Sequence, residues 1–305
     1  MLDLNAPDGH AVDGRATLGG AVRKLAALFR EAGLPSPQLD ARILAAEACG
    51  LSPEDLILKP SAHLSAGQER QIASFAARRL AREPVSRIIG RREFWGLTFG
   101  ISPDTLDPRP ETELLVEAVL SFAKAEGLAH APLRILDLGT GSGCLLGTLL
   151  AGLPQCYGIG LDRSEAALTV ARDNLSRLGL LDRSAFLCAD WMSAIGGAAF
   201  DAIVCNPPYI APSEICQLDP EVKAYDPYLA LNGGEDGLEP YRTIVPQAYA
   251  ALRKGGLLIL EIGHRQGEAV LGLMKQSAPH PGFSGAKILT DMGGTDRAVA
   301  GVRQS

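Results

Sequence analysis

The chain has 305 residues, of which 47% are hydrophobic and 21% charged, and its formal net charge is −6. This length predicts two domains, and no apolar run approaches the ~20 residues that cross a bilayer. The first residues lack the basic start and apolar core of a secretory signal. The six cysteines include no CxxC pair, which disfavours a disulfide framework and a zinc site. We therefore expect a protein of the reducing cytoplasm with no metal and no membrane partner.

Residues 17–85 are predicted to form a small helical domain after a flexible tail at 1–16. Apolar residues recur at helical spacing in two stretches that end on Gly33 and Gly50, and glycine often ends helices. Ser65, with a glutamine three residues later, predicts a capping box before a further helix. No residue here carries obvious chemistry, so we expect this domain to recognise or support a substrate.

Arginine is concentrated near the end of this domain. Residues 70–92 hold seven arginines against one acid, Glu83. Residues 1–92 carry 13 Lys and Arg against 10 Asp and Glu, a net charge of +3, and the remainder carries a net of −9. Such a stretch is either a solvated helix face or a patch that meets RNA or an acidic partner surface. The sequence leaves both interpretations open.

Residues 86–113 are predicted to be a hairpin and linker. The whole segment from 83 is strand-like with glycine and proline punctuation, and EFWGLTFGIS alternates as paired strands do. From 114 to 305 the pattern becomes α/β, starting with a helix at 114–126. Seven apolar segments follow as predicted strands, at 133–139, 157–162, 184–190, 200–206, 256–263, 286–291 and 297–302. Apolar strands alternating with helices indicate a mostly parallel, Rossmann-like sheet covered on both faces, and the close spacing of the last two indicates an antiparallel edge.

A glycine-rich turn follows the first predicted strand of this sheet, directly after Asp137. The turn consists of Gly139, Thr140, Gly141, Ser142 and Gly143. Its glycines permit a tight turn and let a ligand approach the backbone at a helix N-terminus. The GxGxG spacing differs from the GxGxxG of dinucleotide enzymes, but the loop alone is compatible with NAD, flavin or S-adenosylmethionine.

Two further strand ends carry candidate cofactor residues. Asp162 ends the second strand of the sheet and could accept hydrogen bonds from ribose hydroxyls, or could merely cap the next helix. Asp190 and Trp191 follow the third strand. There the indole could pack on adenine while Asp190 accepts from its amino group, or Trp191 could be a core residue.

The sequence Asn206-Pro207-Pro208-Tyr209 follows the fourth strand. Prolines cannot donate to a sheet ladder, so the strand must end here in a stiff loop. The side-chain carbonyl of Asn206 and the backbone carbonyl of Pro207 could both accept from a planar NH2 group, held in place by the prolines. Tyr209 could stack on a flat substrate group. This arrangement indicates methylation of an amide or exocyclic amine.

Together these motifs resemble a known family. DxGxGxG with a downstream NPPY is typical of S-adenosylmethionine-dependent amino-methyltransferases. The segments PVSRIIGRREFWGLTFGISPDTLDPRPETE, ILDLGTGSGCLL, DAIVCNPPYI, LALNGGEDGLEPYRTI and LLILEIGHRQGEAV resemble release factor glutamine methyltransferases, the HemK-type protein-(glutamine-N5) methyltransferases, from about residue 17 to the C-terminus. The resemblance implies a class I methyltransferase domain that methylates the side-chain amide nitrogen of the glutamine in the Gly-Gly-Gln motif of bacterial peptide chain release factors.

By motif, the resemblance places S-adenosylmethionine at the glycine turn, Asp162 and Trp191. It places the substrate glutamine at Asn206, Pro207, Pro208 and Tyr209, of which Asn206, Pro207 and Tyr209 would be catalytic. One departure is visible, because Asp107 follows Leu106 where the family usually has an apolar pair.

Other readings remain. An adenine N6-methyltransferase acting on nucleic acid would need a basic groove and base flipping, which the net charge of −9 disfavours. A nucleotide sensor would not need the NPPY motif. The segment 231–242 either shapes a substrate entrance or starts a helix.

Overall fold

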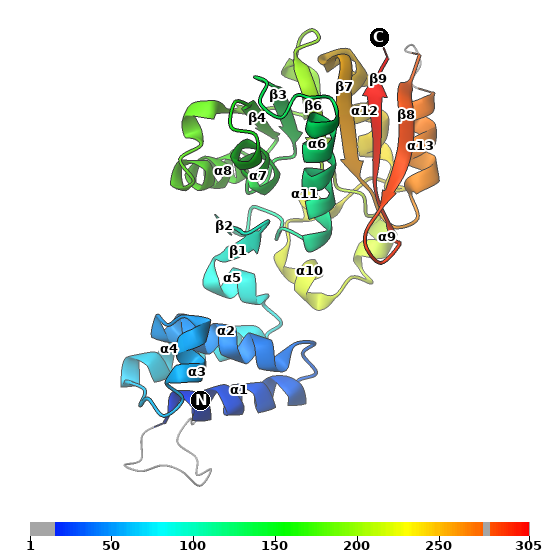
Figure 1. Cartoon of the computed structure of the whole chain (residues 1–305). Helices are drawn as coiled ribbons and strands as arrows, with labels where there is room; N and C mark the ends of the chain where they lie inside the picture. Colours follow the sequence, from blue (N-terminus) through cyan, green and yellow to red (C-terminus); the bar gives the residue numbers. More distant parts are fainter. Residues whose placement is uncertain (1–15, 277–280, 305) are drawn as a thin grey trace. The chain divides into compact units, whose positions relative to one another are not determined.

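The computed structural model of the chain describes residues 16–276 and 281–304. The chain divides into two compact units between Gly90 and Arg91, which we call the helical unit and the sheet unit (Figure 1). The tail predicted at 1–16 lies, but for its last residue, outside the described residues. Among the described residues, no helix is long and apolar enough to cross a membrane.

The helical unit is built around amphipathic helices. Its described helices are α1 (Leu18–Glu31), α2 (Pro37–Cys49), α3 (Pro53–Leu58), α4 (Ala66–Leu80) and α5 (Val85–Ile89). The predicted capping box before α4 is confirmed, since the side chains of Ser65 and Gln68 each accept the other's backbone N–H. Gly50 ends α2 with φ of 65°. The core of this unit contains Leu25, Phe29 and Ile72, all fully buried.

Residues 85–89 correct the prediction of a strand-like segment from 83 onward. They form α5, which begins after Pro84 and ends at Gly90 in the left-handed conformation. The helix buries Ile88 in the core of the helical unit. Val and Ile favour strands only as a weak local preference, and packing of this apolar face overrides it. The hairpin itself, β1 (Arg91–Phe94) and β2 (Leu97–Gly100), starts directly afterwards.

Several arginines of the 70–92 stretch bind groups of the helical unit itself. Arg79 is only 2% exposed, and its Nε donates to Asp40 Oδ2 over 2.8 Å. Arg78 Nε donates to Glu83 Oε2 over 2.8 Å, and Arg82 Nη2 donates to the carbonyl of Ala32 over 3.2 Å. These three side chains therefore bind groups of the helical unit, and only Arg79 among them is fully buried.

The sheet unit confirms the predicted seven-stranded Rossmann-like architecture. Its strands are β3 (Arg134–Leu138), β4 (Tyr157–Asp162), β5 (Ser184–Cys188), β6 (Phe200–Cys205), β7 (Leu252–Glu261), β8 (Phe283–Thr290) and β9 (Asp296–Arg303). They lie in the order β5-β4-β3-β6-β7-β9-β8. The five strands from β5 to β7 are parallel, while β9 is antiparallel to both β7 and β8, which confirms the predicted antiparallel edge.

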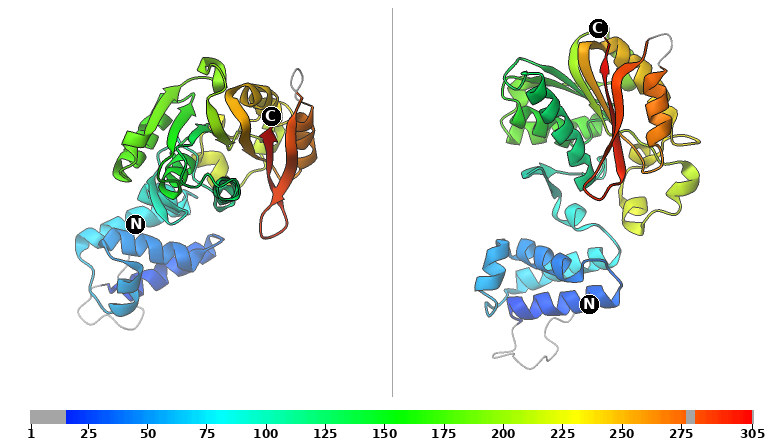
Figure 2. Two further views of the ribbon diagram at one scale, coloured as in Figure 1. Left: turned by 45° about the horizontal axis from the view of Figure 1, so that its top comes forward. Right: turned by 45° about the vertical axis from the view of Figure 1, so that its right-hand side comes forward.

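Helices cover both faces of this sheet (Figure 2). On one face lie α6 (Glu113–Ala125), α7 (Cys144–Gly152) and α8 (Glu165–Arg177), and on the other α12 (Glu239–Ala251) and α13 (Gly267–Lys275). Neighbouring residues of one strand belong to opposite cores, as Ile135 and Leu136 of β3 show. Burial on both faces explains why the strands are continuous apolar runs. The remaining short helices are η1 (Pro110–Thr112), η2 (Leu181–Arg183), η3 (Trp191–Ala194), α9 (Pro212–Ile215), α10 (Pro220–Tyr225) and α11 (Tyr228–Leu231).

Candidate active site

A cavity of about 490 Å³ lies in the sheet unit at the carboxyl ends of β3, β4, β5 and β6. In open α/β sheets, ligands bind in this crevice, where the strand order reverses. Of the residues singled out from the sequence, those that line it are Gly139, Thr140, Gly141, Ser142, Asp162, Asp190, Trp191, Asn206 and Pro208. Gly143, Pro207 and Tyr209 lie next to these in the chain but are not among the lining residues. The cavity therefore joins motifs from four strands in one place.

The glycine turn adopts a backbone that other residues rarely form. Gly139, Gly141 and Gly143 have φ values of 67°, 53° and 76°. A Cβ on Gly143 would lie 3.0 Å from Leu175 Cδ1. This third glycine thus lets α7 pack closely on α8, whereas the first two leave the backbone bare at the cavity.

Asp162 holds the glycine turn in place. Its Oδ2 accepts from the N–H of Gly141 over 3.0 Å, and its Oδ1 accepts from the N–H of Ser164 over 2.9 Å. The N-cap of α8 is Ser164, whose Oγ accepts from the N–H of Ala167, so Asp162 is not the helix cap that the sequence left open. Each carboxylate oxygen has a second lone pair, with which it can accept from a ligand hydroxyl.

Asp137, near the end of β3, also binds the glycine turn. It is fully buried, and its Oδ2 accepts from Thr140 Oγ1 over 2.7 Å and from the N–H of Leu146 over 3.3 Å. Burial raises the pKa of Asp137 to about 7, although the hydrogen bonds from Thr140 and Leu146 act in the opposite direction. The carboxyl therefore links the glycine turn to the start of α7.

Trp191 has an unusual backbone for a bulky residue. β5 ends at Cys188, two residues earlier than predicted, and the chain then turns sharply at Trp191, with φ of 44°. A non-glycine residue in this region costs on the order of 1–3 kcal/mol, and such strain clusters at ligand sites. The N–H of Met192 donates to Gln247 Oε1 over 3.1 Å and anchors the turn. The indole is half-buried and lines the cavity, while Asp190 is exposed.

Asn206 is connected to two residues that the sequence did not single out. Its Nδ2 donates to Thr112 Oγ1 over 3.2 Å, and Thr112 Oγ1 donates to Glu261 Oε2 over 2.6 Å. Thr112 precedes α6, and Glu261 ends β7. Both belong to segments that carry the family resemblance, PRPETE and LLILEIG. A glutamate at the end of an apolar run was the signal that could have pointed to this site.

Glu261 is a second buried carboxyl of the sheet unit, with a side chain that is 3% exposed. Burial raises the pKa of Glu261 to about 7, whereas hydrogen bonds from Thr112 and Asn206 lower it. Glu111 raises this pKa and Arg297 lowers it through their charges. Within the described residues, no group of three His, Cys, Asp or Glu side chains could hold a metal ion.

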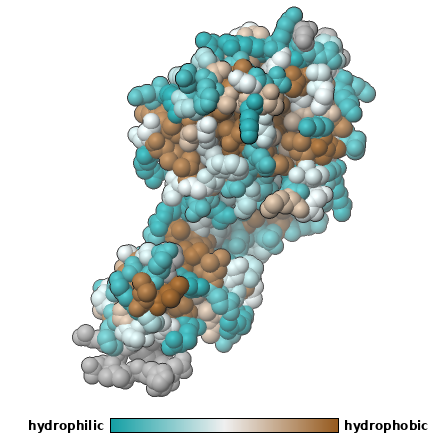
Figure 3. Space-filling view, viewed as in Figure 1, coloured by the Kyte–Doolittle hydropathy of each residue, from teal (hydrophilic) through white to brown (hydrophobic). Residues whose placement is uncertain are grey.

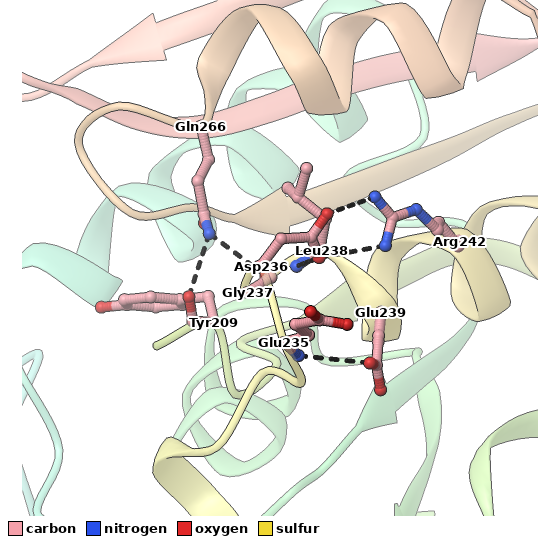
Figure 4. A network of polar contacts seen from close by, with 8 residues as sticks. All are labelled: Tyr209, Glu235, Asp236, Gly237, Leu238, Glu239, Arg242 and Gln266. Carbon is pink, nitrogen blue, oxygen red and sulfur yellow. Dashed lines mark hydrogen bonds and ion pairs between the residues drawn. The ribbon is translucent and has the colours of Figure 1, made fainter. Parts of the chain in front are cut away.

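The backbone carbonyl of Tyr209, rather than its side chain, makes the hydrogen bond that anchors this residue. Its carbonyl accepts from Gln266 Nε2 over 2.9 Å, and the same nitrogen donates to the carbonyl of Gly237 over 3.1 Å (Figure 4). A Cβ on Gly237 would lie 2.4 Å from the Tyr209 carbonyl oxygen, so only glycine fits there. Burial raises the pKa of the Tyr209 hydroxyl.

The predicted helix start in the segment 231–242 is confirmed, and part of the segment borders the cavity. Gly233, Gly234, Glu239 and Pro240 line the cavity, and Glu239 also begins α12. The turn before the helix is braced within itself, because the N–H of Glu235 donates to Glu239 Oε1 over 3.2 Å (Figure 4). The segment thus borders the cavity and starts a helix.

Asp107, the departure noted in the linker, is buried and takes part in a polar contact of the sheet unit. Arg92 Nε lies 4.0 Å from Asp107 Oδ1. The backbone N–H of Asp107 donates to Asp226 Oδ1 over 3.3 Å. Asp226 also pairs with Arg109, whose Nη2 lies 2.5 Å from its Oδ2. An acidic residue fits at this position because the Arg92 guanidinium lies beside its carboxylate.

The seven-stranded sheet, with its cavity at the carboxyl ends of the strands, has the class I methyltransferase fold. Residues 104–218 match the family model of the methyltransferase small domain, and residues 20–90 match that of the PrmC N-terminal domain. The fold resembles the catalytic domain of human METTL16 in complex with the MAT2A 3'UTR hairpin 6, with a TM-score of 0.54 and 18% identity over 70% of this chain and 78% of that one.

Closer relatives define the family. The release factor glutamine methyltransferase of Bradyrhizobium diazoefficiens is 46% identical over 86% of this chain and 88% of its own length. That of Rhodospirillum rubrum is 42% identical over 97% of this chain and 88% of its own length. The chain belongs to the release factor glutamine methyltransferase family and is an S-adenosylmethionine-dependent methyltransferase.

Proposed function

We propose that this protein methylates the side-chain amide nitrogen, N5, of the glutamine in the Gly-Gly-Gln motif of peptide chain release factors. The observation that carries the proposal is that Asn206 and the glycine turn line one cavity, in a chain of the release factor glutamine methyltransferase family. We place the reaction in the cytoplasm, where the six free cysteines persist as thiols.

The residues on the β3 and β4 side fit S-adenosylmethionine. The volume of about 490 Å³ lies within the usual range of roughly 300–1,000 Å³ for small-molecule sites. The bare backbone of the glycine turn would face the amino-acid part of the cofactor. Asp162 would accept from the ribose hydroxyls, and Trp191 would pack on the adenine.

An amide nitrogen is a poor nucleophile because its lone pair is delocalised into the carbonyl. When bound, S-adenosylmethionine supplies a methyl group on a positively charged sulfur. Asn206 Oδ1 and the carbonyl of Pro207 would accept from the glutamine NH2 and orient its nitrogen toward that methyl group. Since Pro207 and Pro208 stiffen the backbone, these acceptors are positioned before the substrate arrives. Tyr209 would close the site beside the substrate amide.

The helical unit is proposed to bind the body of the release factor. Figure 3 shows hydrophobic side chains at the surface of this unit. Its large exposed apolar residues are Leu39, Ile57 and Leu58, of which Ile57 and Leu58 are 66% and 75% exposed on α3. A protein partner would cover such residues on binding.

Methylation of adenine in nucleic acid gains no support as the alternative. The similarity to METTL16 is at 18% identity and concerns the fold alone. Arg78, Arg79 and Arg82, which the sequence offered as part of a basic patch, bind the helical unit itself.

The proposal is tested by incubating a purified release factor with the protein and S-adenosylmethionine, followed by intact-mass measurement and peptide mapping. We expect one added methyl group, on the glutamine of the Gly-Gly-Gln motif. The Asn206→Ala variant should lose at least about 100-fold in kcat because one acceptor of the amide is gone, while it still binds S-adenosylmethionine. A wild-type protein that binds the cofactor but leaves the release factor unmodified would contradict the proposal.

A further inference from the structure

Thr112, Asn206 and Glu261 come from three separate elements and form a hydrogen-bonded chain beside the cavity. Asn206 follows β6, Thr112 precedes α6, and Glu261 ends β7. The donor–acceptor distances are 3.2 Å from Asn206 Nδ2 to Thr112 Oγ1 and 2.6 Å from Thr112 Oγ1 to Glu261 Oε2. Thr112 and Glu261 are both buried, at 3% exposed each. We call these residues the Asn206 relay.

The chemistry of the three groups gives the relay one direction. The Thr112 hydroxyl donates its single hydrogen to Glu261 Oε2, a direction that is obligatory once the carboxyl is ionised, because an ionised carboxylate only accepts hydrogen bonds. The Thr112 oxygen can then only accept from Asn206, and this requires the NH2 group of the Asn206 amide to face Thr112. The hydrogen bond of Asn206 with the Glu261 carboxylate requires the same orientation, because that carboxylate also accepts. The carbonyl oxygen Oδ1 must therefore face the other way. No residue in the described part of the chain donates to Oδ1.

We infer that Thr112 and Glu261 are positioning residues, which fix the orientation of the Asn206 amide so that its carbonyl oxygen is presented to the substrate NH2 group. This inference rests on the proposed function. A flipped amide would place its oxygen against the Thr112 oxygen, whose hydrogen is already given to Glu261. It would also place NH2 against the NH2 of the substrate. Both contacts are repulsive, so the relay selects the one productive orientation.

Other contacts fix Glu261 at its end of the relay. The Tyr241 hydroxyl donates to the backbone carbonyl of Glu261 over 2.9 Å, and Tyr241 is fully buried. Gln266 Oε1, which lies 3.3 Å from the Tyr241 hydroxyl, accepts from the N–H of Gly263 over 3.0 Å. These contacts hold the end of β7 and the turn after it, so the carboxylate can orient Thr112 with little movement.

The test uses the full-length protein and three variants, Thr112→Val, Thr112→Ser and Glu261→Gln. Thr112→Val keeps the shape but removes the hydroxyl, and we expect kcat to fall roughly 10- to 100-fold because the reacting amide loses its fixed orientation. Thr112→Ser retains a hydroxyl and should stay within about threefold of wild type. In Glu261→Gln the new side-chain amide can donate to Thr112 as well as accept from it, so the hydrogen bonds of the relay no longer have one fixed direction. We expect kcat to fall about 10-fold. The Kd for S-adenosylmethionine should change less than about threefold in all three.

The chain offers a matched control in Thr148→Val. Thr148 lies in α7, is 1% exposed, and its hydroxyl has no hydrogen-bond partner among the described residues. Thr148→Val makes the same replacement of a buried hydroxyl by a methyl group as Thr112→Val. The kcat of the Thr148→Val variant should therefore remain that of wild type. A double variant Thr112→Val/Glu261→Gln should be no slower than the slower single variant, because the two residues act as one unit.

A spectroscopic readout separates the relay from the proposed reaction. The side-chain NH2 signal of Asn206, identified by its absence in Asn206→Asp, should shift in Thr112→Val and remain unchanged in Thr148→Val. This measurement needs no substrate. If the wild-type protein methylates no release factor but the signal shifts, the proposed function fails and the relay stands. Wild-type kcat in Thr112→Val, or an unshifted NH2 signal, overturns the inference.

Discussion

Two regions of this protein, the core of the helical unit and the residues behind the cavity of the sheet unit, bury carboxyl groups in different ways. In the helical unit, Asp40 is 7% exposed and is paired with Arg79, which is 2% exposed, at 2.8 Å. In the sheet unit, Asp137 and Glu261 are buried as deeply, but each accepts from a threonine hydroxyl instead of a cation, Thr140 for the first and Thr112 for the second. In this second arrangement, burial raises the pKa of each carboxyl to about 7.

This difference separates support of the fold from arrangement of a site. A buried ion pair satisfies both charges and joins α2 to α4. A buried carboxyl held by a hydroxyl stays costly to ionise, yet it orders its partner with a defined direction. Both such carboxyls in the sheet unit lie directly behind cavity residues, one behind the glycine turn and one behind Asn206. The buried carboxyls that accept from a threonine hydroxyl therefore mark the positions where the protein fixes the geometry of its site.

The largest expected effect concerns the helical unit. Arg79→Met should lower the free energy of unfolding by about 3–5 kcal/mol, because it leaves Asp40 buried without its cation. Urea denaturation of full-length protein measures this loss. The double variant Asp40→Asn/Arg79→Met should recover part of it. At a temperature where Arg79→Met is folded, its Kd for S-adenosylmethionine should equal that of wild type. A weakened Kd would show that this ion pair also affects the site in the sheet unit.

The next effect is a pH dependence of stability from the sheet unit. Asp137 and Glu261 keep their protons up to about pH 7 in the folded protein, while in the unfolded chain they lose them near the ordinary pKa values of 3.8 and 4.5. The folded state therefore binds more protons between about pH 4 and 7. The stability contribution of each group is fully present below about pH 4 and is lost as the pH rises through about 7.

Asp137→Asn and Glu261→Gln should each flatten this decline, by up to about 1.4 kcal/mol per pH unit. Urea denaturation at pH 5, 6, 7 and 8 measures the slopes. Asp201→Asn is a suitable control, since Asp201 is a less buried carboxyl paired with Arg253 at 2.9 Å. Equal slopes in wild type and both buried-site variants would show that these carboxyls ionise at ordinary pH.

The smallest effect is expected at the surface of α3. Replacing Ile57 and Leu58 by serine should raise KM for the release factor by about three- to tenfold, since exposed apolar contacts at a partner surface are lost. The KM for S-adenosylmethionine and the free energy of unfolding should stay near wild type, because both side chains are exposed. The matched control is Leu181→Ser, an exposed leucine of the sheet unit. An unchanged KM for the release factor would remove α3 from the proposed contact.

The sequence by itself determined the seven strands, the antiparallel edge, the glycine turn and the position of Asn206 at a strand end. These features are local, because side-chain period, glycine and proline act on their own stretch of chain. The tertiary structure alone decided that Val85–Ile89 is a helix, that Arg79 lies buried on Asp40, and that Thr112 and Glu261 stand behind Asn206. Such contacts join residues 39 to 149 positions apart, and they depend on the order and register of whole elements, which no local pattern encodes.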